Sequence, residues 1–262
     1  MLTSNMVSIE KFIPVMAKLK REVATKYTGR IIYITVSGSH LYGFPSVDSD
    51  VDYRGCFIAH SNFLLGLNKP CKMLVTMKVP DVVLMELGQE LNLALKGNCN
   101  ILEHWFSTPV FQHWNYKYLK ELIEDIIGKD GVYHSYRGMA TFNYKKFLLG
   151  GKTTYKKYLY VFRALMAGTY FLEVGHIEPN INKLNQHFKI KEVKELVKAK
   201  ISGQELDLAI DVNSGRLDEI ITVLFHRIDR AYEKSHLPHK PDNKDVKLVN
   251  STLLDFRKEM LN

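Results

Sequence analysis

Strand signals occupy only the first part of this chain, and this separation constrains the fold more than any other feature. β-branched and aromatic runs bounded by turn residues predict strands at Ile31–Val36 and Val51–Ala59. A third strand is expected from either Met73–Val79 or Val82–Leu87, with a bulge or tight turn between the two runs. No convincing strand follows about Thr108, because helical spacing of apolar residues takes over there.

The expected helices share apolar residues spaced three and four apart. They cover residues 8–27, two helices from Leu87 to Phe106 divided at Gly97-Asn98, and then Tyr118–Ile127, Tyr133–Leu149, Thr154–Val174, Ile190–Ala199, Arg216–Lys234 and Val249–Met260. Strands first and helices afterwards are typical of an α+β arrangement. We therefore expect one domain over residues 1–110 and a helical domain over residues 111–262.

Charge and composition narrow the classes of partner. The 262 residues carry a formal net charge of +8, which favours anionic partners such as nucleic acids and nucleotides. No apolar run approaches the ~20 residues of a membrane span, and the first residues lack the build of a signal peptide. Cys56, Cys71 and Cys99 are odd in number and widely spaced, so we expect neither a disulfide framework nor a cysteine metal site. This pattern predicts a cytoplasmic protein without a membrane anchor.

Gly38 and Ser39 follow the first predicted strand directly. Gly38 has no Cβ, so the backbone can turn sharply and approach a ligand closely. Backbone N–H groups and the Ser39 hydroxyl can then surround phosphate oxygens. The longer glycine-rich phosphate loop G-x-x-x-x-G-K-[ST] is absent. A Gly-Ser pair alone is more often an ordinary turn.

Asp50 and Asp52 stand at the start of the second predicted strand. Residues i and i+2 of a strand point to the same side, so the two carboxylates are expected to face one another. Like charges that close repel unless a cation lies between them. Carboxylate oxygens suit Mg²⁺, which takes its other ligands from water and substrate phosphates. For an isolated pair of this kind, a solvated strand edge is the more common explanation.

Together, the two features resemble a known signature. The arrangement G-S-x10-D-x-D is similar to that of the DNA polymerase-β-like nucleotidyltransferase superfamily. The longer stretch GSHLYGFPSVDSDVDYRGCF resembles one branch, the predicted nucleotidyltransferases related to RNA-repair-ligase-associated polymerase-β-like proteins. GNCNILEHWF, KKYLYVFRAL and LPHKPD resemble later segments of the same branch, although Cys99 stands where that branch usually has proline.

The resemblance implies a polymerase-β-like head with a mixed sheet over residues 1–110, followed by a helical domain that could bind the acceptor. It also implies a third carboxylate on a neighbouring strand. Asp81 opens a β-rich segment and is preferred, whereas Glu86 suits the first turn of a helix, where an acid is favourable. Asp50, Asp52 and Asp81 would bind two Mg²⁺ ions, which Mn²⁺ can replace, and catalyse transfer from a nucleoside triphosphate.

The remaining candidates concern substrate contacts. Gly38, Ser39, His40 and Arg54 are expected to contact the nucleotide, with a structural salt bridge from Arg54 to Asp52 as an equal alternative. For Glu103 two interpretations stay open, a hydrogen-bonding support for the active-site loop or a helix cap. Possible RNA-binding residues are the cations interleaved with tyrosines in the helical domain: Lys145, Lys146, Lys156, Lys157 and Arg163.

The leading hypothesis is therefore a metal-dependent transferase that moves a nucleoside monophosphate from a nucleoside triphosphate to a hydroxyl group. An RNA 3′ end, with tRNA as one candidate, is the preferred acceptor. A protein AMP-transferase of antitoxin type and a catalytically silent nucleotide- or RNA-binding module are the alternatives. Nothing in the sequence indicates the oligomeric state.

Overall fold

The computed structural model describes residues 9–65, 67, 73–149, 154–202 and 214–259. Within them, the strands form one mixed sheet in the order β3-β4-β2-β1-β5. The strands are β1 (Arg30–Ser37), β2 (Asp52–Ile58), β3 (Leu74–Met77), β4 (Val82–Glu86) and β5 (Pro109–Gln112). β2 runs parallel to β4, and the other neighbouring strands are antiparallel. The mixed sheet and the helices that follow it confirm the predicted α+β fold class.

Two of the strand predictions change with the structure. Both alternatives for the third strand are present, as β3 and β4, and the chain turns between them at Lys78–Asp81. The prediction that no strand follows Thr108 is wrong, because β5 pairs with β1 at the edge of the sheet. β5 is only four residues long and begins with Pro109, so its sequence carries little strand signal.

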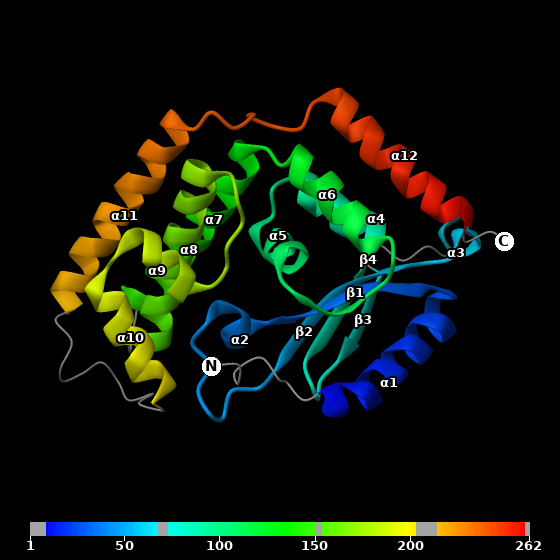
Figure 1. Cartoon of the computed structure of the whole chain (residues 1–262), viewed down its shortest axis with the longest axis horizontal. Coiled ribbons are helices and arrows are strands. Elements are labelled where there is room, and N and C mark those ends of the chain that lie inside the picture. Colours follow the sequence, from blue (N-terminus) through cyan, green and yellow to red (C-terminus); the bar gives the residue numbers. More distant parts are fainter. Residues whose placement is uncertain (1–8, 66, 68–72, 150–153, 203–213, 260–262) are drawn as a thin grey trace.

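Helices cover both faces of the sheet (Figure 1). On one face lies α1 (Ile9–Tyr27), whose buried Leu19 and Val23 pack with Ile34 and Phe57 of the strands. This is the amphipathic helix that the sequence predicts. On the other face lie α4 (Leu87–Leu95), α5 (Cys99–Phe106) and α6 (Tyr116–Ile126). The short helices α2 (Gly38–Tyr42) and α3 (Ser61–Leu65) follow β1 and β2. We call the sheet with α1–α6 the head.

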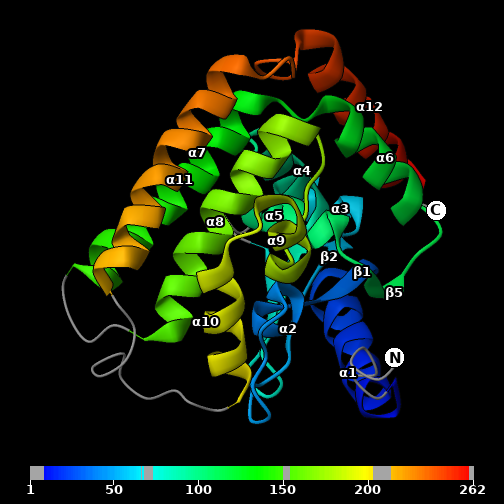
Figure 2. The ribbon, with the colours of Figure 1, turned by 60° about the vertical axis from the view of Figure 1, so that its left-hand side comes forward.

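The helices α7–α11 form a second unit beside the head, which we call the helical lobe (Figure 2). They are α7 (Lys129–Asn143), which continues as the π-helical turn η1 (Tyr144–Leu148), α8 (Tyr155–Val174), α9 (Ile181–Phe188), α10 (Lys191–Ile201) and α11 (Ser214–Lys234). α8 is buried over most of its length and packs against α7, α9, α10 and α11. Its central position explains why its apolar residues do not keep to one side of the helix.

The last helix, α12 (Asn243–Glu259), returns from the helical lobe to the head. It begins earlier than Val249, where the sequence places its start, because the Asp242 side chain accepts hydrogen bonds from two backbone N–H groups of the first turn. At its other end, Arg257 pairs with the buried Glu86 at 3.2 Å. α12 therefore ties the C-terminal region to the far end of β4.

One continuous apolar core connects the head and the helical lobe. It includes Tyr33 of the sheet, Leu102 of α5, Ile123 of α6 and Phe162 of α8, all of which are fully buried. Cys56 and Cys99 are buried free thiols, and Cys71 lies outside the described residues. No helix in the described part of the chain is long and apolar enough to cross a membrane.

Candidate active site

The Gly-Ser turn lies directly against the second aspartate of the motif. β1 and β2 are antiparallel, and Ser37 at the end of β1 is paired with Asp52 at the start of β2. Gly38 then takes a left-handed backbone conformation with φ of 63°. A Cβ atom at this position would collide with Oδ2 of Asp52. Glycine is therefore required both by the turn and by the close approach of the carboxylate.

Asp81 lies beside Asp52 because their strands are parallel. Tyr53 of β2 is in register with Val82 of β4, and the Tyr53 N–H donates to the Asp81 carbonyl oxygen at 2.8 Å. The residues that precede these two positions therefore lie at the same end of the sheet. Partial burial raises the pKa of Asp52 although Arg54 opposes the shift, and the carboxyl groups of Asp81 and Asp50 raise it further. Crowded carboxyl groups of this kind favour the binding of a cation.

Arg54 forms an ion pair with the third acid, Asp81. Its Nη2 lies 2.8 Å from Oδ2 of Asp81, and its Nη1 donates to the Tyr53 carbonyl oxygen at 2.8 Å. The alternative expected from the sequence, a salt bridge from Arg54 to Asp52, is replaced by a pair with Asp81. The Arg54 side chain is 24% exposed, so solvent still reaches it at this end of the sheet.

Glu86, the alternative third carboxylate, lies at the opposite end of β4. Its side chain accepts from the Gly88 N–H at 2.8 Å and pairs with Arg257 of α12. Only 1% of Glu86 is exposed. The structure thus brings Asp81, and not Glu86, next to Asp52.

Asp50 lies outside the strand that was expected to hold it. β2 begins at Asp52, so Asp50 and Val51 precede it, and Asp50 is exposed. The alternation of side chains along a strand therefore does not determine where the Asp50 side chain points. Among the described residues, no three His, Cys, Asp or Glu side chains are grouped as they would be around a metal ion. The acids nevertheless fit Mg²⁺ in kind, because carboxylates are hard oxygen donors. Burial is the main cause of the raised pKa of Asp52, and the neighbouring carboxyl groups of Asp81 and Asp50 add to it.

A buried histidine contacts the residue that directly precedes the Gly-Ser turn. Nε2 of His104, on α5, lies 3.2 Å from Oγ of Ser37, the residue just before Gly38. Burial, with a smaller effect of the Arg54 charge, lowers the pKa of His104 to about 3, so the imidazole is neutral at physiological pH. No spacing in the sequence connects His104 to Ser37, and this contact depends on the packing of α5 against β1.

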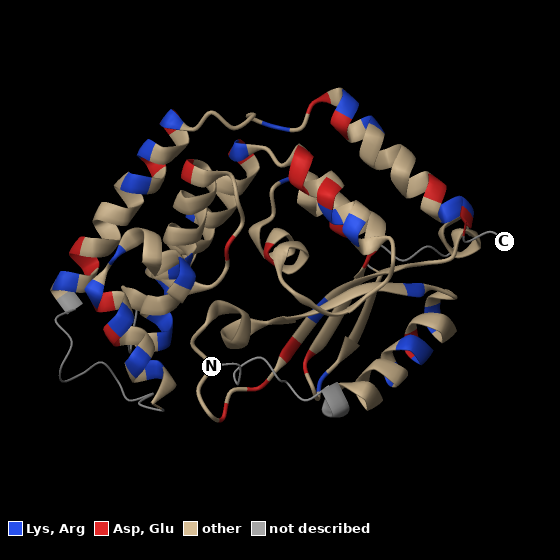
Figure 3. Cartoon of the chain, viewed as in Figure 1, with Lys and Arg blue, Asp and Glu red and all other residues tan. Residues whose placement is uncertain are grey.

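The loop between α2 and β2 carries a further polar network. His40 Nε2 lies 3.2 Å from the Ser49 carbonyl oxygen, which links the predicted nucleotide-binding turn to the residue before Asp50. Ser39, the other predicted residue of the turn, lies in α2 and is partly exposed. Figure 3 shows acidic residues on this loop and at the adjoining ends of the strands, with Lys and Arg residues along α10 and α11 of the helical lobe.

The predicted RNA-binding residues separate into two groups. Lys145 and Lys146 in η1 and Lys156 at the start of α8 are exposed, and Lys157 beside them is half-buried. Lys146 Nζ lies 5.1 Å from the centroid of the Phe147 ring, and Lys157 Nζ lies 5.7 Å from it. Cations and aromatic rings thus occur together in this part of the helical lobe.

Arg163 is different, and its assignment as an RNA-binding residue is wrong. It is 1% exposed and pairs through Nη1 with Oε1 of the fully buried Glu103. Tyr136 donates to the same oxygen at 2.9 Å, and the ring of Tyr42 lies 3.7 Å from the guanidinium carbon. Lys156 and Arg163 are seven residues apart on α8 and so share one side of the helix, but this spacing does not reveal that the helix is buried at Arg163. Glu103 therefore stabilises the interface between the head and the helical lobe. The helix-cap interpretation does not apply to it, because the cap of α5 is Asn98.

Tyr160 of α8 lies close enough to the acids for the charge of Asp52 to affect it. Its ring contacts those of Tyr42 and Phe44 edge-on, each at 5.8 Å between centroids. Burial raises the pKa of Tyr160, the Arg163 charge opposes this, and the negative charge of Asp52 raises it further. The helical lobe therefore packs against α2 and extends to the acidic end of the sheet.

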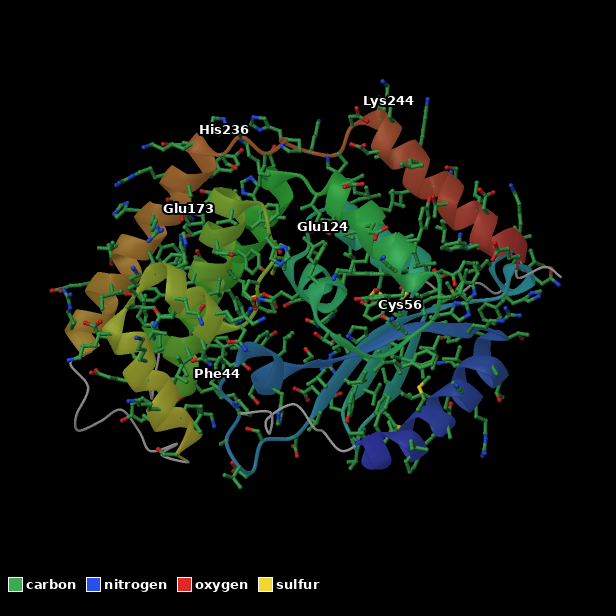
Figure 4. The ribbon with its side chains drawn as sticks, in the orientation of Figure 1. Phe44, Cys56, Glu124, Glu173, His236 and Lys244 are labelled. Carbon is green, nitrogen blue, oxygen red and sulfur yellow. The ribbon has the colours of Figure 1, made fainter. Side chains whose placement is uncertain are left out.

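A separate cavity of about 590 Å³ lies where α8 and α11 end, near Glu173 and His236 (Figure 4). Arg227, Arg230 and Lys234 also line it, and Arg227 is paired with Glu173 at 2.9 Å. None of the residues predicted from the sequence lines this cavity. The candidate active site is therefore the acidic end of the sheet.

The mixed sheet, with the Gly-Ser turn and acids at adjoining strand ends, is consistent with a polymerase-β-like nucleotidyltransferase. More narrowly, the chain belongs to the RlaP family, described as the RNA repair pathway DNA polymerase beta family, whose model matches residues 13–255. The resemblance stated from the sequence motifs is thereby confirmed.

Two curated relatives each match most of this chain. The uncharacterized protein YcgL of Bacillus subtilis is 29% identical in an alignment 259 residues long, which covers 94% of this chain and 96% of YcgL. The uncharacterized protein MJ0002 of Methanocaldococcus jannaschii is 28% identical in an alignment 221 residues long, which covers 80% of this chain and 88% of MJ0002. Among solved structures, a nucleotidyltransferase-like protein from Exiguobacterium sibiricum is 12% identical with a TM-score of 0.28, covering 93% of this chain and 80% of that protein.

Proposed function

We propose that this protein is a metal-dependent nucleotidyltransferase, which moves a nucleoside monophosphate from a nucleoside triphosphate to a hydroxyl group. The observation that carries the proposal is the position of Asp52. Its carboxylate lies against the Cβ-free side of Gly38 and beside Asp81, and its pKa is raised. Acids with shifted pKa values gather at functional sites, and Arg54, although it lowers the pKa of Asp52, is paired with Asp81.

Asp50, Asp52 and Asp81 would hold the metal ions. These ions would be Mg²⁺, or Mn²⁺ in place of Mg²⁺. When bound there, the ions would neutralise the crowded carboxylates and the triphosphate and favour the deprotonated form of the attacking hydroxyl. Binding would favour the charged form of Asp52 and so oppose the upward shift of its pKa. Asp81, which is 46% exposed, would orient the acceptor hydroxyl or receive its proton, while Arg54 stays beside it to balance the charge.

Gly38 and Ser39 would face the triphosphate because the turn brings backbone close to Asp52. The acceptor oxygen attacks the α-phosphorus, a new O–P bond forms, and the bond from the α-phosphorus to the bridging oxygen of the β-phosphate breaks. The electron pair leaves with pyrophosphate, and the hydroxyl proton passes to a carboxylate or to water. His104, which is neutral and buried, would hold the turn through Ser37 without adding charge.

An RNA 3′ end is the acceptor that we propose. Lys145, Lys146 and Lys156 are exposed beside aromatic rings of η1 and α8, and phosphate contacts with base stacking are the usual means of binding single-stranded RNA. The basic surface belongs to the helical lobe, which packs against α2 and so extends to the acids. The net charge of +8 favours the same class of partner.

The test is to incubate the full chain with radiolabelled nucleoside triphosphates, Mg²⁺ or Mn²⁺ and total RNA. We expect label on RNA with the wild-type protein and none with the Asp50→Ala/Asp52→Ala double variant. Asp125→Asn, an exposed acid on α6, is the matched control and should transfer label normally. Comparing the four triphosphates then defines the nucleotide that is used.

Other outcomes identify the alternatives. Label on protein in place of RNA would mean a protein nucleotidyltransferase. Absence of label from every acceptor, with nucleotide binding unchanged in the double variant, would mean a binding module and would contradict the proposal.

A further inference from the structure

A lysine of the helical lobe is buried against the loop that leads to the acids. Lys200 lies near the end of α10 and is only 2% exposed. Its Nζ donates to Oγ of Ser46, in the loop between α2 and β2, at 2.9 Å. Burying an ammonium group is costly unless it is hydrogen-bonded, so this contact is a specific feature of the interface between lobe and head. Figure 2 shows α10 next to this part of the head.

Ser46 is the centre of a compact turn. The Ser49 N–H donates to the Ser46 carbonyl oxygen at 3.0 Å, and the Ser46 N–H donates to Oγ of Ser49 at 2.9 Å. The two hydroxyl oxygens also lie 2.9 Å apart. Because an ammonium group can only donate, Ser46 Oγ must accept from Lys200, which leaves its own O–H to donate to Ser49 Oγ or to the Asp48 carboxylate. Lys200 therefore fixes the orientation of the hydroxyl around which the turn closes.

The turn connects to both halves of the candidate active site. The Ser49 carbonyl oxygen lies 3.2 Å from His40 Nε2, two residues after Gly38, and Ser49 is followed directly by Asp50. Asp50 has no strand pairing of its own, since β2 begins at Asp52. Its position therefore depends on the loop before it. The helical lobe holds this loop near its start, where Asn182 Nδ2 donates to the Gly43 carbonyl oxygen at 2.6 Å, and closer to Asp50 through Lys200 at Ser46.

We propose that Lys200 is a positioning residue for the acidic site: through Ser46 and Ser49 it holds the loop that presents Asp50 beside Asp52. It acts on the metal-binding geometry and need not touch the nucleotide or the acceptor. The catalytic consequence rests on the proposed nucleotidyl transfer, whereas the structural and metal-binding consequences do not. The helical lobe would then contribute directly to the geometry of the acids.

Lys200→Met removes the donor and keeps most of the side-chain volume, and Lys198→Met on the exposed side of the same helix is the matched control. We expect Lys200→Met to weaken Mn²⁺ binding, measured by electron paramagnetic resonance, by roughly 10–100-fold, as for other residues that orient metal ligands. Hydrogen exchange in the peptide covering residues 45–50 should become faster. Where transfer is measured, the Mn²⁺ concentration for half-maximal rate should rise more than the KM for the acceptor.

Ser46→Ala removes the hydroxyl that accepts the hydrogen bond from Lys200. It provides the same test if Lys200→Met does not fold. In a double-variant cycle, the two changes together should cost no more Mn²⁺ affinity than the larger of them alone. Unchanged Mn²⁺ affinity and unchanged exchange in folded Lys200→Met or Ser46→Ala would overturn the inference. Absence of transfer by the wild-type protein would contradict the proposed function alone, because exchange of the loop still tests Lys200.

Discussion

Asp52 and Asp81 lie side by side because the Tyr53 N–H, one residue after Asp52, donates to the carbonyl oxygen of Asp81 at 2.8 Å. This bond belongs to the parallel pairing of β2 with β4, which places the starts of both strands at one end of the sheet. The pairing therefore converts two acids that are distant in sequence into one crowded group.

Asp52→Asn should abolish the proposed transfer while preserving the fold. We expect activity to fall by at least about a hundredfold, comparable to the loss of one essential charge-stabilising group. The raised pKa of Asp52 means that its charge is unfavourable in the apo protein, so the amide should not lower the melting temperature. Labelled transfer and thermal unfolding check this. A large loss of stability would instead assign Asp52 a structural role.

Glu90 should make the stability of the protein depend on pH. It is buried in α4, Tyr33 donates to its Oε2 at 3.0 Å, and burial raises its pKa from 4.5 to about 8. The unfolded chain therefore releases this proton at lower pH than the folded chain. The free energy of unfolding should fall as pH rises from about 5 to about 8, by at most about 1.4 kcal/mol per pH unit.

Glu90→Gln keeps the shape and removes the ionisation, so this part of the pH dependence should disappear. Urea unfolding of both proteins across that pH range provides the measurement. An identical slope in the wild type and the variant would show that other groups cause the pH dependence.

Arg163→Met should destabilise the protein without acting through RNA. The change leaves Glu103 as a fully buried carboxylate that has lost its ion pair, and breaking such a pair costs about 3–5 kcal/mol. Chemical denaturation measures the loss. Adding Glu103→Gln should recover part of it, since the uncompensated charge is then removed. If the two changes were simply additive, the buried pair would not be the cause.

Lys145→Gln/Lys146→Gln should weaken RNA binding and leave stability unchanged, because both lysines are exposed. If each contacts one phosphate, the slope of log affinity against log salt should decrease by about 0.7 per lysine. Filter binding of a single-stranded RNA at several salt concentrations measures this. Lys244→Gln/Lys247→Gln on α12 removes the same charge at another exposed surface and should have a smaller effect. Equal effects of the two pairs would argue against a defined RNA surface in η1.

Much of the fold and part of the site could be predicted from local patterns. The apolar spacing predicted α1 and most helices of the lobe, because burial of one helix face repeats every three or four residues. The motif with Gly38, Ser39, Asp50 and Asp52 identified the family before any contact was known. By contrast, β5 and α9 were missed, since short elements carry few residues from which a period can be recognised.

The class of protein and the turn at Gly38 can be recognised from the chain alone, since both depend on residues that lie close together along it. Which acid joins Asp52 depends on tertiary packing, because Asp81 and Glu86 both fit the local pattern and the parallel register of β4 separates them. Tertiary packing also decided that Arg163 is buried with Glu103 and that Lys200 reaches Ser46. Such contacts join residues far apart in the chain, and the packing of helices against the sheet determines them.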